Sequence, residues 1–429
     1  MSKAKTTSLI AIILLLCLAP ARGQVRRDAS FHERYTLEQV VVFSRHNIRA
    51  PLSGPGSAVA KVTPHRWHEW SSAPGELSLR GGALETMMGQ FFRKWLVSES
   101  FMAENEIPGD GEFRFYSNSM QRTIATARYF AAGMLPVAPV TVEHHYRVGT
   151  MDPVFNPRIT KVDEEFRQKA AKEIADLFGD GSMEGIGAKI ADNLKLMEKV
   201  LDMRKSPAAQ RGDTCSFRTD DTAVKFELYR EPAMTGGLKL ACSVSDAFVL
   251  QYYEAQDERT AAFGHRLSED DWKRISGVKD WYEDVLFTAP LVAVNVAHPL
   301  LLEILHELRD KGRRFSFLCG HDSNICSVLS ALGCKGYTLE GAIESKTPIG
   351  GKIVIEKWLG TDGQEYAAVN LVYQDVGQLR SLSLLSLQDP PKVIPLHFES
   401  LSENGDGLFR LRDLEELFEE KIRLYDSLP

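Results

Sequence analysis

The stretch Val40-Val41-Val42-Phe43-Ser44-Arg45-His46-Asn47-Ile48-Arg49-Ala50-Pro51 decides how this chain folds. The four β-formers Val40 to Phe43 are typical of a buried strand, and Pro51 with Gly54-Pro55-Gly56 marks the loop that follows it. The strand therefore delivers His46 to a loop at its carboxyl end. In open α/β sheets, ligands bind in the loops at this end of the strands.

The residues around His46 have the chemistry of a phosphate site. The guanidiniums of Arg45 and Arg49 each offer forked donors to phosphate oxygens, and an imidazole between them can attack phosphorus or donate a proton. An Arg-His-x-x-Arg pattern also occurs by chance in ordinary loops, so this motif alone leaves both interpretations open.

A second apolar strand ends in a histidine far downstream. The segment Phe315-Ser316-Phe317-Leu318-Cys319-Gly320-His321-Asp322 runs into a glycine, a histidine and an acid, and residues 323–332 have the pattern of a helix. Both histidines that end a strand are therefore candidates for the same kind of site, and the choice between a catalytic and a chance occurrence applies to each.

Together these segments resemble the paired signature of the histidine acid phosphatases, a branch of the phosphoglycerate-mutase-like superfamily that includes bacterial phytases. The first match is Arg45 to Pro51, and the second is Gly320-His321-Asp322. A third lies between them, where Ser117-Asn118-Ser119-Met120-Gln121-Arg122-Thr123-Ile124-Ala125-Thr126-Ala127 is similar to the family segment that carries another phosphate-binding arginine, here Arg122. Three motifs in the family's order are a specific signal.

One departure from the family pattern points to a subgroup. Most of the family has glycine after the first histidine, whereas this chain has Asn47, as in the periplasmic glucose-1-phosphatases. Similarity to that subgroup runs from about Tyr35 to the end of the chain, and it includes Ser245-Asp246-Ala247-Phe248 and Leu250-Gln251-Tyr252-Tyr253-Glu254.

The expected fold is α/β, a central mixed sheet flanked by helices with a mostly helical inserted domain. Residues 24–150 and 290–429 would form the catalytic domain, because both ends of the chain carry site motifs. Residues 151–289 would form the insertion, where 164–178 and 183–204 are charged and amphipathic. Further helices are expected at 81–98, 119–130, 290–311 and 411–424, and a hairpin from 352–358 and 366–373.

The resemblance implies a two-step phosphoryl transfer without a cofactor or a metal. His46 would form a covalent phosphohistidine, and Asp322 would protonate the leaving oxygen and then assist the attacking water. Four side chains would hold the phosphate oxygens, namely Arg45, Arg49, Arg122 and His321. Arg122 is expected near a helix N-terminus, which already favours an anion. At low pH Asp322 is expected to stay protonated and His321 cationic, so an acidic optimum is expected.

An acid of the insertion is expected to narrow the substrate pocket, as the subgroup resemblance implies. Glu231, which precedes a Gly236-Gly237 turn, is favoured over Glu254 for this substrate-binding role, and an exposed carboxylate is the alternative for either.

Residues 1–23 are expected to be a secretory signal peptide. Lys3 and Lys5 precede ten apolar residues, and small residues then offer cleavage sites before Gln24. Ten apolar residues are too few to span a bilayer, and no other segment is expected to cross one. Cleavage lowers the formal net charge from −7 to −10, which argues against nucleic acid as a partner. The mature protein is therefore expected to be periplasmic or secreted, with a small phosphorylated substrate as its partner; oligomeric state is open.

Five cysteines remain after cleavage, and an oxidising compartment allows disulfides. The expected pairs are Cys215 with Cys242 and Cys326 with Cys334, which leaves Cys319 as a buried core residue. The cysteines have no metal-ligand spacing. His65 and His68 are three residues apart, but they are expected to be loop residues rather than ligands.

The substrate is expected to be a small sugar phosphate such as glucose 1-phosphate, hydrolysed by an acid phosphatase. A phytase of the same family is the first alternative. A non-catalytic protein that binds phosphate esters is the alternative from another class, although such proteins usually lack the nucleophile or the acid, and this chain has both His46 and Asp322.

Overall fold

The structure, a computed structural model, describes residues 27–54, 56–255 and 257–429. Among these residues, eight strands form one mixed sheet in the order β10-β8-β7-β1-β6-β2-β3, with β9 also paired to β8. The strands are β1 (Tyr35–Arg45), β2 (Phe113–Ser117), β3 (Val142–Glu143), β6 (Phe315–Gly320), β7 (Lys352–Gly360), β8 (Glu365–Tyr373), β9 (Lys392–Pro395) and β10 (Phe409–Arg410). Strands β1, β6, β2 and β3 are parallel, and β7 to β10 pair antiparallel.

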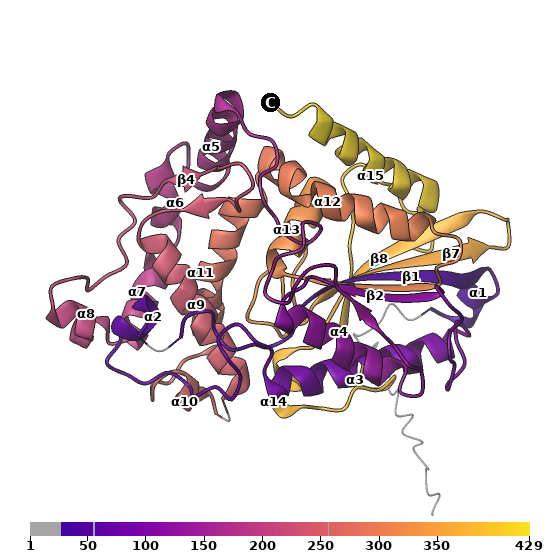
Figure 1. Cartoon of the computed structure of the whole chain (residues 1–429), viewed down its shortest axis with the longest axis horizontal. Helices are drawn as coiled ribbons and strands as arrows, with labels where there is room; N and C mark the ends of the chain where they lie inside the picture. The colour runs from indigo at the N-terminus through magenta and orange to yellow at the C-terminus, as the bar shows by residue number, and fades with distance from the viewer. Residues whose placement is uncertain (1–26, 55, 256) are drawn as a thin grey trace, which may run out of the picture.

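Helices cover both faces of the sheet, as Figure 1 shows. One face carries α3 (Leu79–Ser98) and α4 (Gln121–Met134), and the other carries α12 (Pro290–Arg309), α13 (Asp322–Ala331) and α15 (Leu411–Asp426). The alternation of side chains along β1 explains this arrangement. Val40 and Val42 pack with α3 and α4, whereas Val41 and Phe43 pack with α12, α13 and α15. The expected mixed sheet flanked by helices is confirmed.

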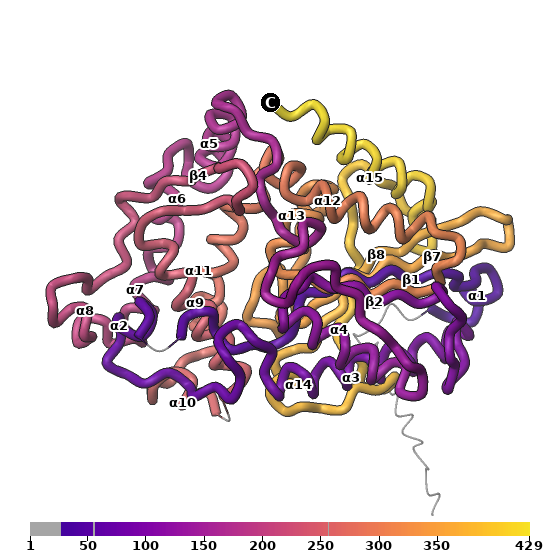
Figure 2. Tube along the Cα trace, viewed as in Figure 1, coloured from indigo at the N-terminus to yellow at the C-terminus, as the bar shows by residue number. Residues whose placement is uncertain are grey.

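The parallel register brings the three motif loops to one edge of the sheet. Arg45 is paired with Gly320, and Ser117 is paired with Cys319, so β1, β6 and β2 end at the same level. Figure 2 shows strands from the two ends of the chain side by side in this sheet. The residues that follow these strands therefore converge, although they are far apart in the sequence.

A second, mostly helical region, here called the cap, lies beside the sheet, and its apolar core continues into residues of α3, α12 and α13. Its elements are α5 (Glu164–Phe178), α6 (Met183–Lys189), α7 (Ala191–Val200), the 3-10 helix η1 (Met203–Lys205), α8 (Pro207–Gln210), β4 (Val224–Lys225), β5 (Ala233–Met234), α9 (Gly237–Glu254), α10 (Glu258–Ala261) and α11 (Glu269–Phe287). The short helices α1 (Ala29–His32), α2 (Ala58–Lys61) and α14 (Val376–Ser381) lie outside it in sequence.

Two expectations about helices need correction. The single helix expected over 183–204 is three, because the chain breaks at Ile190 and again at Asp202, which has a left-handed backbone. Helix α12 is long and apolar enough to cross a membrane by length and composition, contrary to expectation. Its most apolar window is 67% buried inside the protein, where it packs on α13 and α15 as a core helix.

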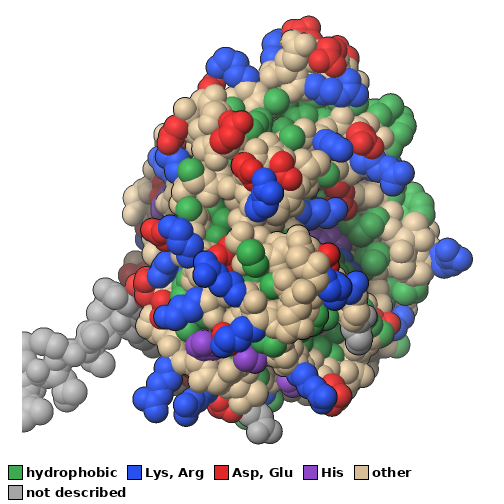
Figure 3. Space-filling view, turned by 90° about the vertical axis from the view of Figure 1, so that its left-hand side faces the viewer, with side chains coloured by type: hydrophobic (Ala, Val, Ile, Leu, Met, Phe, Trp, Pro, Cys, Tyr) green, Lys and Arg blue, Asp and Glu red, His purple; other side chains and the backbone are tan. Residues whose placement is uncertain are grey.

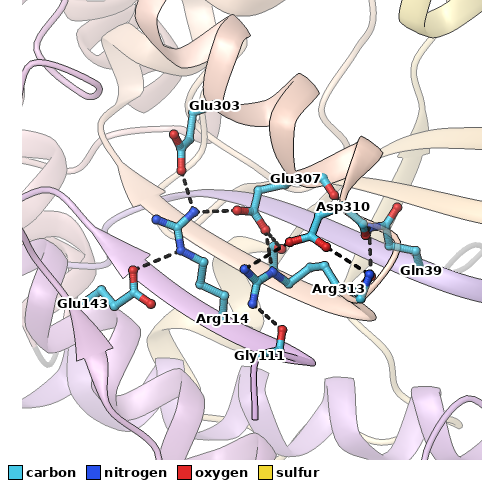
Figure 4. Close-up of polar contacts among 10 residues, drawn as sticks. Gln39, Gly111, Arg114, Glu143, Glu303, Glu307, Asp310 and Arg313 are labelled. Atoms are coloured by element: carbon cyan, nitrogen blue, oxygen red, sulfur yellow. Dashed lines mark hydrogen bonds and ion pairs between the residues drawn. The ribbon is translucent and has the colours of Figure 1, made fainter. Parts of the chain in front are cut away.

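The opposite end of the sheet is closed by a network of charged side chains, which Figure 4 shows. Arg114 of β2 pairs with Glu303 and Glu307 of α12, and Glu307 also pairs with Arg313 at 3.0 Å. Glu307 is fully buried, so these two arginines satisfy a carboxylate that would otherwise be costly to bury. The network ties α12 to the sheet far from the loops that carry His46 and His321.

Candidate active site

His46 is the first residue after β1, and its loop fixes the ring in one tautomer. The His46 backbone N–H donates to the Gly320 carbonyl at 3.1 Å, which holds the loop against the end of β6. The ring Nδ1 lies 2.8 Å from the Asn47 carbonyl oxygen, and only an Nδ1–H can donate to that oxygen. Nε2 therefore carries the free lone pair. Burial and the nearby Arg122 guanidinium lower the pKa of His46 well below its ordinary value, so the ring is neutral.

Asn47 anchors this loop from within the core. Its amide donates to Glu85 at 2.8 Å, and its backbone N–H donates to the Thr126 hydroxyl at 3.2 Å. Glu85 forms an ion pair of 3.0 Å with Lys352, and both side chains are fully buried. The carbonyl that sets the His46 tautomer is therefore held by contacts to α3, α4 and β7.

Three arginines surround His46 with donors that lack partners. The Nε–H groups of Arg45, Arg49 and Arg122 are buried and donate to no acceptor within the described part of the chain. A buried donor left unsatisfied costs about 1–3 kcal/mol. Burial and the Arg49 charge also lower the pKa of Arg122 to about 10, which reflects repulsion between the guanidiniums. An anion such as phosphate would satisfy the donors and relieve the repulsion.

Asp322 is held as a carboxylate by two cations. Its Oδ2 lies 3.0 Å from Arg45 Nη2 and 2.9 Å from Lys279 Nζ. Burial alone would raise the pKa of Asp322, but the Lys279 and Arg45 charges outweigh burial and hold that pKa well below its ordinary value. The expectation that Asp322 keeps its proton at mildly acidic pH is therefore wrong for the unliganded site.

His321 is also neutral, contrary to expectation. Burial and the Arg122 guanidinium lower the pKa of His321 well below its ordinary value. The Asn118 amide lies 2.7 Å from Nε2 of this ring, and the His46 and His321 ring centroids are 5.5 Å apart. The two neutral imidazoles thus face each other beside the arginines.

A cleft of about 340 Å³ opens over these residues, between the sheet edge and the cap. His46, Arg49, Arg122, His321 and Asp322 line its floor. Cap residues form the opposite wall, namely Glu231, Pro232, Cys242, Ser243, Asp246, Lys279, Tyr282, Glu283, Leu286 and Phe287.

Glu231 and Glu254, the two acids considered for narrowing the pocket, differ in position: only Glu231 lines the cleft. Glu254 instead accepts a hydrogen bond of 2.8 Å from the hydroxyl of Ser78, the residue that caps α3. The carboxylate of Glu254 therefore serves the packing of α9 on α3, whereas that of Glu231 faces the cleft.

Sequence reasoning missed three charged residues of the cap wall. Asp246 binds Arg49 at 3.1 Å, and Lys279 binds both Asp322 and Glu283, at 2.9 and 2.6 Å. Lys279 and Glu283 are four residues apart on α11, among the apolar positions of a buried face. An ion pair at this spacing inside an apolar stripe is the signal that could have identified them.

The five described cysteines are unpaired, so neither expected disulfide is present. Cys326 belongs to the cap core, whereas Cys334 packs against the core beneath α12 and α15. Cys215 is exposed in a loop, and Cys242 lines the cleft. Each expected pair thus has its two members in different environments. Cys319 is buried and free, as expected.

One group of possible metal ligands lies in the described residues, away from the cleft. His65 lies 3.0 Å and His265 3.9 Å from the Asp202 carboxylate, which also pairs with Lys205 at 2.9 Å. His65 stacks on Phe263 at a centroid distance of 4.8 Å. These contacts join three segments of the chain, and His65 thus has partners that its sequence position did not reveal.

The sequence and the fold match known phosphatases. A family model described as histidine phosphatase superfamily (branch 2) matches residues 36–374. A glucose-1-phosphatase of Providencia rettgeri is 37% identical over 421 residues, which cover 94% of this chain and 97% of that protein. The phytase AppA of Escherichia coli is 28% identical over 402 residues. The match covers 90% of this chain and 91% of that protein.

Solved structures agree with the sequence comparisons. The Hafnia alvei phytase in complex with myo-inositol hexakis sulphate superposes with a TM-score of 0.81 and is 28% identical. The match covers 90% of this chain and 97% of that structure.

Proposed function

This chain belongs to branch 2 of the histidine phosphatase superfamily and is a phosphatase, and we propose that it hydrolyses monophosphate esters of sugars, with glucose 1-phosphate as the preferred substrate. The floor of the cleft supports binding of one phosphate group, since three arginines with unsatisfied donors surround a neutral histidine. The glucose-1-phosphatase of Providencia rettgeri, similar over nearly its whole length, supports the choice of substrate.

The charge of the cap wall carries the choice between glucose 1-phosphate and phytate. Two acids outside the Lys279 ion pairs face the cleft from the cap, namely Glu231 and Asp246, of which Asp246 is paired with Arg49. The cation of that wall, Lys279, is already paired with Asp322 and Glu283. An inositol hexakisphosphate would place its further phosphates against these acids, whereas the hydroxyls of a sugar can donate hydrogen bonds to them.

The proposed reaction has two steps, with roles assigned from geometry. Nε2 of His46 attacks phosphorus, the ester P–O bond breaks, and Asp322 gives a proton to the leaving oxygen. Arg45, Arg49 and Arg122 hold the oxygens as charge develops. In the second step water attacks the phosphohistidine, Asp322 takes the water proton, and phosphate leaves.

Phosphate release from glucose 1-phosphate and from phytate, measured at mildly acidic pH with chelator present, tests the proposal. We expect a higher kcat/KM for glucose 1-phosphate. His46→Ala should lose at least about 10³-fold, because no other group can form the intermediate. Hydrolysis of neither ester, with phosphate binding retained, would instead support a non-catalytic binding protein. Preference for phytate would support the alternative phytase function.

Replacing Glu231 with arginine tests the role of the cap charge. We expect the phytate-to-glucose-1-phosphate ratio of kcat/KM to rise about 5-fold or more, because a repulsive carboxylate becomes an attractive guanidinium. The matched control is Glu227→Arg, which makes the same charge change on an exposed residue outside the cleft. An equal change of the ratio in both variants would exclude a local role for Glu231.

Two expectations from the sequence enter the proposal unchanged. We propose that residues 151–289 act as a separate cap domain on the catalytic domain of 24–150 and 290–429. We also propose that the chain is exported to the periplasm or beyond; its expected signal peptide, 1–23, lies outside the described residues. N-terminal sequencing of the exported protein would test this, with Gln24 expected as the first residue.

A further inference from the structure

The free site poses a problem for acid catalysis. The leaving oxygen of an alkyl phosphate needs a proton, yet Asp322 is ion-paired with both Arg45 and Lys279. A carboxylate between two cations is the form that this geometry stabilises. The proton that Asp322 donates must therefore reach it from another group once the substrate is bound.

Glu283 is the neighbouring group that can hold such a proton. It lies one helical turn after Lys279 on α11, and Lys279 Nζ is 2.6 Å from Glu283 and 2.9 Å from Asp322. Lys279 is 4% and Glu283 8% exposed, and both line the cleft, so water reaches them only from the cleft side. Among the described residues neither Glu283 Oε2 nor Lys279 Nζ has a hydrogen-bond partner, so Lys279 contacts the two carboxyls as an ion pair. A protonated carboxyl there would avoid burying a second negative charge.

Several charged and titratable groups surround Glu283. They are Lys279 on its own helix, Asp322 and Cys326 on α13, Arg45 at the end of β1, and Cys242 on α9. Burial and the Asp322 charge raise the pKa of Glu283 well above its ordinary value, despite the opposing cations. The two carboxyls joined by Lys279 thus have pKa values displaced in opposite directions, which is the arrangement of a proton donor and its acceptor.

We propose that Glu283 and Lys279 form a proton relay that loads Asp322 for its role as the general acid. This inference rests on the proposed phosphatase function and adds the source of the proton. When a phosphate group binds the arginines, Arg45 divides its charge between the phosphate and Asp322. Lys279 then passes one proton to Asp322 and takes one from Glu283 in the same step, so the lysine stays an ammonium.

The relay balances over the whole cycle. Glu283 loses its proton to Asp322 through Lys279, and Asp322 gives it to the leaving oxygen, which departs as an alcohol. In the second step Asp322 takes a proton from the attacking water, and the relay returns it to Glu283. The net reaction is ester plus water to alcohol plus phosphate, and no other reactant is needed.

Glu283→Gln tests the relay with two kinds of leaving group. Glutamine has nearly the same shape but cannot store or release the proton. The alkyl ester glucose 1-phosphate needs the proton, whereas the nitrophenolate of p-nitrophenyl phosphate leaves without one. At pH 6 we expect kcat/KM to fall about 10- to 100-fold for glucose 1-phosphate and to change less than about 3-fold for p-nitrophenyl phosphate. The deficit should shrink at lower pH, where solvent protonates Asp322 directly.

A second variant keeps the ion pairs but blocks proton transfer. Lys279→Arg retains the positive charge, and a guanidinium does not give up its proton in proteins. The same selective loss on glucose 1-phosphate is expected. Asp284→Asn is the control for folding and charge, since Asp284 is the next residue on α11 and pairs with Lys346 outside the cleft. Thermal unfolding of each variant checks that the fold is kept.

The possible results distinguish failure of the proton relay from failure of the proposed substrate preference. Equal losses on both esters in Glu283→Gln would mean a structural role, and no loss on either would mean that Asp322 is loaded without Glu283; each overturns the relay. A wild-type protein that hydrolyses p-nitrophenyl phosphate and glycerol 2-phosphate, but not glucose 1-phosphate, contradicts the proposed substrate alone. The glycerol ester then replaces glucose 1-phosphate in the comparison.

Discussion

His46 shows how one residue is prepared for attack by its surroundings. Its Nδ1–H donates to the Asn47 carbonyl, and the Asn47 side chain donates to Glu85. The lone pair therefore lies on Nε2, where it is free to attack phosphorus. The neutral state of the ring follows from burial near three guanidiniums. The same burial that makes the ring nucleophilic also makes it hard to protonate.

This neutral histidine predicts how stability changes with pH. Its folded pKa lies below the unfolded value of about 6.5, so the unfolded chain binds more protons below that pH, and stability is lost as pH falls through 6.5. We expect His46→Ala to lower the number of protons taken up on unfolding by up to one. Urea unfolding between pH 6.5 and 5 should show the wild type losing up to about 1.4 kcal/mol per pH unit more than the variant. If the free energy of unfolding depended on pH equally in the wild type and in His46→Ala, a neutral His46 would be contradicted.

At the scale of elements, the loop after β1 depends on a buried ion pair between α3 and β7. Glu85 of α3 and Lys352 of β7 are both fully buried and 3.0 Å apart, and Glu85 also accepts the Asn47 amide. The pair therefore connects the first motif to a strand from the last third of the chain. Such a pair adds little net stability as a unit, but breaking it exposes one partner as an uncompensated buried charge.

Lys352→Met should accordingly lower the free energy of unfolding by about 3–5 kcal/mol at neutral pH. The loss should be smaller at pH 5, because burial already raises the pKa of Glu85 and a protonated Glu85 needs no cation. Adding Glu85→Gln should recover part of the loss. Lys357→Met on the same strand, whose Glu365 partner is half-exposed, should cost less than about 1 kcal/mol. Denaturant titrations would measure all four proteins, and similar losses at Lys352 and Lys357 would refute this account.

At the scale of the whole molecule, the sheet and the cap enclose one cleft whose floor is positive and whose cap wall carries acids. Figure 3 shows positive and negative side chains interspersed over the cap face that lies to the left in Figure 1. Among the described residues, the cap face seen there offers no patch of a single sign, whereas Arg49 and Arg122 line the cleft and can bind an anion locally. A ligand that binds them also binds only the folded chain.

Inorganic phosphate should consequently stabilise the protein. At about 100 times its Kd, phosphate would add about 2.7 kcal/mol to the free energy of unfolding. Arg122→Ala should lose most of this gain, because it removes a donor from the floor of the cleft. Arg128→Ala, an exposed arginine on the same helix, should keep it. Thermal melts in phosphate, against sodium chloride at equal ionic strength, would measure the gain. An undiminished gain in Arg122→Ala would place the anion elsewhere.

The sequence by itself predicted the long strands of the sheet, the helices that flank it and the motif residues of the cleft floor, but not the long cap helices α9 and α11. Apolar runs that end in Arg45-His46 and Gly320-His321 predict strands, and parallel strands must end at a common edge, so their loops meet. Local patterns suffice for these features because side-chain periodicity is written in consecutive residues. The break of 183–204 was missed because it depends on turns at Ile190 and Asp202.

Only the tertiary structure decided the charge states of the site. Lys279 and Glu283 come from a helix of the cap. Their spacing in the sequence indicates a buried ion pair, but not that this pair would reach Asp322. Whether Asp322 holds a proton depends on which charges lie within a few ångströms of it in a desolvated cleft. The motifs therefore predict which groups meet the phosphate, whereas long-range packing sets their protonation, because electrostatic interactions follow distance in space and not separation along the chain.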